Sequence, residues 1–142
     1  MSSFPNLIRL HKWKLEEHRR KLGDLEGLAR SFADQIRGLE ERTRVEGNVA
    51  RDVPEVAHAL GGFVQASLAQ REKLNSSLAD VEREIAEMRA RVTDSFRELK
   101  RYEVADARRR ERARLATNRR ERIHEDDLGV EIYRRRNAAK GG

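Results

Sequence analysis

The sequence predicts an all-α protein: a long antiparallel two-helix coiled-coil hairpin with an overhanging basic C-terminal helix. Three observations predict it. Apolar residues recur at alternating steps of three and four in two separate series, a helix-start signature lies between the series, and the excess positive charge is confined to the C-terminal third. The 142 residues are 39% charged and only 5% aromatic, which is too polar for an ordinary globular core. The periodicity distinguishes the chain from a disordered one of similar composition.

The first helix is expected at about 4–46. Its seam, the line of residues that faces the partner helix, holds five heptads without a slip. The seam positions are Phe4, Ile8, His11, Leu15, His18, Leu22, Leu25, Ala29, Phe32, Ile36, Leu39 and Thr43. His11 and His18 are two turns apart, roughly 10 Å along the axis, so they cannot ligate one metal together. Both are expected to be half-buried seam residues that keep the register.

The second helix is expected at about 54–128, after a tip at 47–53. Asp52 as N-cap, Pro54 in the first turn and Glu55 three residues after the cap form a helix-start signature. The second seam holds Leu60, Val64, Ser67, Arg71, Leu74, Leu78, Val81, Ile85, Met88, Val92, Ser95, Leu99 and Tyr102. Gly61 and Gly62 either bend this helix or belong to a longer tip that ends before Phe63; the start signature favours the bend.

The two seams suggest a register for the hairpin. With the turn near Asp52, opposed residues have numbers that sum to about 103, which places Leu22 opposite Val81 and Arg71 opposite Phe32. Apolar side chains then face apolar side chains along most of the pair.

The positive charge lies in the overhang. Residues 100–142 hold 14 Lys and Arg against 8 acidic residues, an excess of six that equals the formal charge of the whole chain. The helix is expected to continue unpaired through Arg108, Arg109, Arg112, Arg119 and Arg122 and to offer a surface to an acidic partner. A solvated helix end without a partner explains the same residues equally well. Residues 129–142 are expected to be a flexible basic tail.

The predicted fold argues against catalysis. A two-helix hairpin has no concave interior to gather polar groups away from water, so we expect no enzyme, no cofactor and no metal site. The chain has no Cys and no run of 18 apolar residues, and its N-terminus lacks a signal-peptide pattern. A cytoplasmic protein is expected.

Apolar residues outside the seams indicate binding surfaces. Leu10 and Trp13 lie three apart on the outward face of the first helix, and Trp is enriched in protein interfaces. Near the tip, Leu60, Phe63 and Leu68 belong to a broader apolar patch than one seam requires.

Three segments resemble the FliJ family of flagellar export proteins. They are Leu7-Ile-Arg-Leu-His-Lys-Trp-Lys-Leu-Glu-Glu-His-Arg-Arg-Lys-Leu22, the stretch from Ala57 to Leu74, and Phe96-Arg-Glu-Leu-Lys-Arg-Tyr-Glu103. The resemblance covers nearly the whole chain.

The resemblance implies a non-enzymatic component of the bacterial flagellar type III export apparatus. Such a protein is a coiled-coil stalk that links the export ATPase ring to the export gate in the membrane and escorts export chaperones. It is cytoplasmic and peripherally associated with the inner-membrane apparatus. The ATPase-facing surface would hold Phe4, Leu10, Trp13, Arg108, Arg109, Arg112, Arg119 and Arg122. The gate-facing surface would hold Leu60, Phe63 and Leu68.

A basic coiled-coil nucleic-acid-binding protein is the alternative. An arginine-rich helix that projects from a coiled coil is how basic-zipper proteins reach the major groove. Glu111 and Glu121 interrupt the basic segment here, and a hairpin closed within one chain supplies no second basic helix to fork around the duplex. We therefore expect no nucleic acid among the partners.

Overall fold

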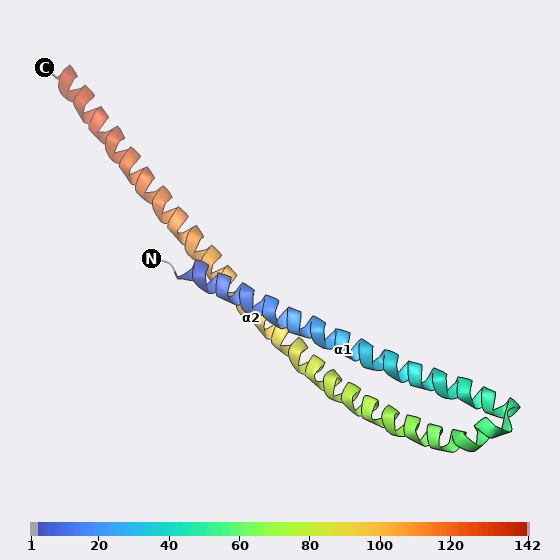
Figure 1. Cartoon of the computed structure of the whole chain (residues 1–142). Coiled ribbons are helices and arrows are strands. Elements are labelled where there is room, and N and C mark those ends of the chain that lie inside the picture. Colours follow the sequence, from blue (N-terminus) through green and yellow to red (C-terminus); the bar gives the residue numbers. More distant parts are fainter. Residues whose placement is uncertain (1–2, 142) are drawn as a thin grey trace. The chain divides into compact units, whose positions relative to one another are not determined.

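The protein is an all-α two-helix hairpin. In the computed structural model, which describes residues 3–141, α1 runs from Phe4 to Asp52 and α2 from Pro54 to Lys140. The chain divides into two compact units, which we call the hairpin unit (His11–Arg97) and the terminal unit (Met1–Leu10 with Glu98–Gly142). Within the hairpin unit, α1 and α2 run side by side in opposite directions (Figure 1). The fold class that the seams predict is thus confirmed.

The connection between the helices is a single residue, Val53. Its N–H donates to the carbonyl of Val49 at 3.1 Å, and its own carbonyl accepts from the N–H groups of Val56 and Ala57 at 3.1 and 3.2 Å. Proline disfavours helical geometry in the residue before it and fits the first position of a helix, where no N–H is needed. Pro54 therefore both ends α1 and starts α2, with only Val53 between the two helices.

The bounds of the tip differ from the prediction. Residues 47–52, expected in the tip, form the last turns of α1, and the N-cap position falls on Val53 rather than on Asp52. Gly47, the first residue of the expected tip, has no positive φ, so nothing in its backbone ends the helix there. The start of the second helix at residue 54 is confirmed.

Helix α2 continues through its glycines. Gly61, Gly62 and Gly129 all lie within it, so the longer tip ending before Phe63 is wrong. The expected tail is also helical as far as Lys140, and an ion pair between Arg135 and Glu131, four residues apart, supports it at 2.7 Å. Each interior glycine costs about 1 kcal/mol relative to alanine, and this cost is too small to break the helix where good helix formers surround the glycines.

The core of the hairpin unit is one layer of side chains between the two helices. Leu15 of α1 and Leu74, Val81, Ile85 and Met88 of α2 are buried. Most other seam residues of α1, from Leu22 to Thr43, are half-buried, because a two-helix pair covers each seam from one side only. His11 is buried and His18 half-buried, so both histidines belong to the seam as predicted.

The register differs from the predicted one. The Nδ1 atom of His18 lies 2.8 Å from Oγ of Ser95, and the guanidinium of Arg71 lies 2.9 Å from the carboxylate of Glu40. These pairs have numbers that sum to 113 and 111, not 103, and Arg71 pairs with Glu40 rather than stacking on Phe32. The observed sums exceed the predicted one by ten and eight, slightly more than one heptad of seven residues. Because the seam repeats every seven residues, a shift of one heptad again opposes apolar to apolar, and seam matching cannot distinguish the two registers.

Candidate partner-binding surfaces

The contact between the ends of the helices in the terminal unit involves two of the predicted partner-binding residues. The guanidinium of Arg109 lies over the ring of Phe4, 5.8 Å from its centroid. Arg109 also donates to the carboxylate of Asp106 at 3.1 Å, and Arg110 makes an ion pair with the same carboxylate at 2.9 Å. Asp106 is only 4% exposed. Phe4 and Arg109 therefore hold α1 against α2, and only part of each is accessible to another protein.

Asp106 and its two arginines form a compact charged cluster. Burial of a carboxylate is costly unless cations and hydrogen bonds compensate it, and two guanidinium groups do so here. The Nε atom of Arg109 is buried without a hydrogen-bond partner among residues 3–141. Asp106 is not among the residues predicted from the sequence; its place three and four residues before two arginines was the available signal.

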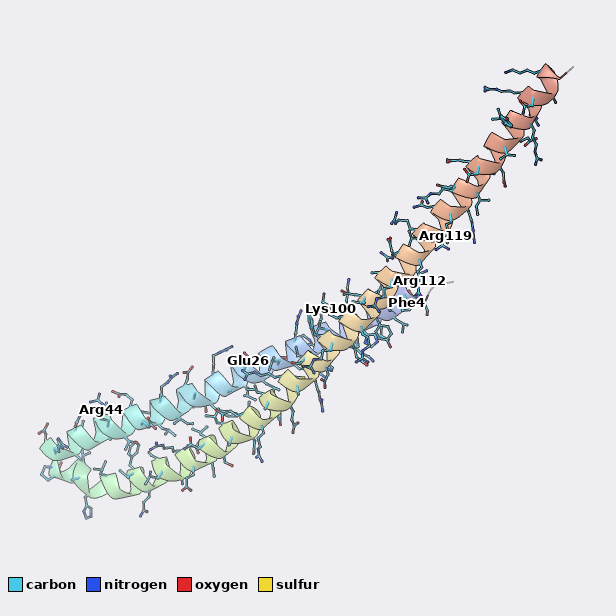
Figure 2. All side chains as sticks on the ribbon, turned by 180° about the vertical axis from the view of Figure 1, so that it is seen from behind. Phe4, Glu26, Arg44, Lys100, Arg112 and Arg119 are labelled. Carbon is cyan, nitrogen blue, oxygen red and sulfur yellow. The ribbon has the colours of Figure 1, made fainter. Side chains whose placement is uncertain are left out.

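The other four predicted arginines form what we call the basic face: Arg108, Arg112, Arg119 and Arg122. Steps of four, seven and three residues place them on one side of α2. All four are exposed, and none makes an ion pair within the described part of the chain. Figure 2 shows Arg112 and Arg119 on α2, with Arg119 farther along the helix from Phe4. The basic face thus presents uncompensated positive charge.

One acidic residue beside the basic face, Glu111, is engaged elsewhere. Glu111 accepts from Arg114 at 2.6 and 3.1 Å, and this hydrogen bond lowers the pKa of Glu111. Arg20 and Arg44 lower the pKa of Glu17 and Glu41 in the same way on α1. All three pairs span three residues of one helix, so they neutralise charge locally and leave the basic face unchanged.

Leu10 and Trp13 are exposed on α1. Leu10 lies in the terminal unit and Trp13 in the hairpin unit, where 61% of the Trp13 surface is accessible. This outward position matches the prediction from their spacing. The sequence alone locates both residues because they fall between seam positions.

Near the tip, the three predicted residues line two separate depressions. A groove of about 170 Å³ between α1 and α2 is lined by Leu39, Glu40, Thr43, Val64, Ser67, Leu68 and Arg71. Leu60 and Phe63 line a second depression with Glu46, Val56 and Ala59, of about 260 Å³. Leu68 is 54% exposed, so an apolar partner reaches it without a rearrangement.

The groove has a signal in the sequence that the prediction did not use. Thr43 and Ser67 occupy seam positions, and both are small and polar. Thr43 satisfies its hydroxyl by donating to the carbonyl of Leu39 at 2.9 Å, and Ser67 is buried. Small residues at a seam leave the space between two helices underfilled, which produces the groove.

Residues 3–141 hold neither a metal cluster nor a membrane-spanning stretch. They contain no group of three or more His, Asp or Glu side chains placed to hold a metal ion. Neither helix, over its described length, has a stretch that is apolar enough to cross a membrane.

No family model, no curated protein and no solved structure matches the chain.

Proposed function

We propose that this chain is a non-enzymatic component of the bacterial flagellar type III export apparatus. It acts as a coiled-coil stalk between the export ATPase ring and the export gate, and it escorts export chaperones. Its place is the cytoplasm, at the periphery of the inner-membrane apparatus. The proposal starts from the resemblance of three segments, of which Leu7 to Leu22 is the most extensive.

The exposed charge of the basic face is the strongest support for the proposal. The basic face lies on α2 beyond the contact with Phe4, exposed and without ion pairs within residues 3–141. A rigid helix that presents unpaired arginines suits an acidic protein surface, because charge complementarity accelerates docking and selects the partner. The residues proposed to contact the ATPase are those of the basic face and Leu10 in the terminal unit and, separately, Trp13 in the hairpin unit. Phe4 and Arg109 support it by holding α1 to α2.

The gate-facing surface of the proposal is the apolar region near the tip. Leu60, Phe63 and Leu68 offer partly exposed side chains there, and Leu68 lines the groove between α1 and α2. An apolar surface of this kind binds by burial of side chains rather than by charge, so the two surfaces are expected to differ in their response to salt.

The test uses two charge-matched variants of the full chain. The basic-face variant carries Arg108→Gln, Arg112→Gln and Arg119→Gln. The control variant loses three arginines that are already paired within their own helix: Arg44→Gln, Arg83→Gln and Arg135→Gln. Both lose the same charge, and surface substitutions change stability by only about 0.5 kcal/mol each.

Binding to the purified export ATPase is measured by surface plasmon resonance at several salt concentrations, with swarming of cells that carry each variant. We expect the wild-type interaction to weaken with salt and the basic-face variant to bind more weakly than the control variant. Equal binding by both variants would mean that the basic face is a solvated helix end without a partner. Salt-sensitive binding of random duplex DNA at physiological ionic strength, with no ATPase binding, would support the nucleic-acid alternative instead.

A further inference from the structure

The end of α2 exposes a second set of apolar side chains that no helix of the chain covers within residues 3–141. Ile123, Val130 and Tyr133 are 61%, 49% and 65% exposed. They fall on one helical face with Asp126 and Asn137, at steps of three, four, three and four residues. We call this line of five residues the outer seam. A regular heptad seam on an unpaired helix is typical of a surface that receives another helix.

Charges are arranged symmetrically around the outer seam. Acidic residues at 125–127 precede Val130 and Tyr133, and the three arginines at 134–136 follow them. Over 123–140 the four acidic residues equal the four basic ones, so the segment has no net charge. Unlike the basic face, this segment does not attract a partner of one charge sign. The charge pattern of this segment is instead complementary to the same segment of a second helix that runs in the opposite direction.

We propose that the outer seam binds the outer seam of a second copy of this chain, in antiparallel orientation. The register that fits has residue numbers that sum to about 263. Val130 then lies opposite Tyr133 of the second copy, and Asp126 lies opposite Asn137. The residues that flank the seam bring Asp127 beside Arg134 of the second copy. Twofold symmetry repeats each of these contacts.

The antiparallel orientation follows from the charges. A parallel pair in register sets Asp126 against Asp126 inside the outer seam and Arg119 against Arg119 four residues before its first member, Ile123. Like charges opposed in this way disfavour the parallel pair. The antiparallel pair avoids both contacts. Glu131 and Arg135 stay outside the interface, because they pair with each other at 2.7 Å on another side of α2. The inference depends on the end of α2 alone and is independent of the proposed export function.

The first test is sedimentation equilibrium of the full chain. The wild type is expected to dimerise reversibly, in the micromolar range that suits a short seam. Asp127→Arg places two arginines together and Arg134→Asp places two carboxylates together, so each variant alone should weaken the dimer about tenfold or more. The double variant Asp127→Arg/Arg134→Asp restores opposite charges across the pair and should recover most of the affinity. A wild-type chain that stays monomeric up to millimolar concentration overturns the proposal.

A matched control exchanges charges outside the interface. The variant Glu131→Arg/Arg135→Glu keeps the ion pair within the helix and the net charge of the chain, and it should dimerise like the wild type. Circular dichroism of every variant checks that α2 remains helical. If the control weakens the dimer as much as Asp127→Arg does, the interface lies on a different face and the proposal is wrong.

The second test determines the orientation. The chain has no native Cys, so introduced cysteines report on their own positions. A mixture of Asp126→Cys and Asn137→Cys chains, one of them tagged, should form the mixed disulfide. Antiparallel pairing brings the Cα atoms of these two positions within roughly 7 Å, the largest separation that a disulfide bridges. Asn137→Cys alone should crosslink poorly. Efficient self-crosslinking of Asn137→Cys, without the mixed product, would establish a parallel pair and overturn the antiparallel model.

Discussion

The imidazole of His18 and the hydroxyl of Ser95 meet at 2.8 Å, although 77 residues separate them along the chain. Both occupy seam positions, so this hydrogen bond lies between α1 and α2 and fixes which turns of the helices face each other. Apolar seam residues tolerate a shift by one heptad, but a displaced His18 loses this partner. Together with the ion pair between Glu40 and Arg71, the contact selects the observed register.

The register gives the first prediction. The variant His18→Cys/Ser95→Cys should form a disulfide within one chain, because the two side chains are already in contact. Leu22→Cys/Val81→Cys should not, since these positions oppose each other only in the register one heptad away. Oxidised samples are compared by mass spectrometry after digestion. Efficient crosslinking of the second pair and failure of the first would mean that the register with sums near 103 is the one populated in solution.

Asp106 gives the second prediction. Asp106→Ala should lower the free energy of unfolding of the terminal contact by about 2 kcal/mol, because two guanidinium groups lose a buried carboxylate. Amide hydrogen exchange over residues 4–10 measures this effect directly, since the first turns of α1 should open more often. Glu111→Ala removes an acid of the same helix from an exposed ion pair with Arg114 and is the control. We expect it to change exchange by less than about 0.5 kcal/mol. Equal protection in both variants would show that Asp106 is not structural.

The glycines of α2 give the third prediction. A Cβ atom at Gly61 or Gly62 would meet nothing within 4 Å, and neither residue has a positive φ. Replacing each by alanine should therefore stabilise the hairpin by about 1 kcal/mol, as expected for an exposed position inside a helix. Thermal denaturation followed by circular dichroism measures the gain. A loss of stability in Gly61→Ala/Gly62→Ala would indicate that this stretch adopts a non-helical conformation in solution.

Much of the fold follows from local pattern. The seams identify two helices because a step of three or four residues is the only periodicity that keeps apolar side chains on one side of a helix. Pro54 determines the start of α2 through its fixed φ and missing N–H. Leu10 and Trp13 are outward residues for the same geometric reason. These features depend on neighbours a few residues away, which is why the sequence by itself determined them.

The register, the tip and the roles of individual charges were decided only by the tertiary structure. A heptad repeat is nearly degenerate under a shift of seven residues, so the choice depends on a few polar contacts such as His18 with Ser95. Gly47 and Gly129 look like helix ends in the sequence, yet α1 and α2 continue through them because helix formation is cooperative. Arg109 and Arg112 look equivalent in a basic run. Arg109 pairs with Asp106 along α2 itself, but only the packing of α1 against α2 places Arg109 over Phe4, while Arg112 stays exposed.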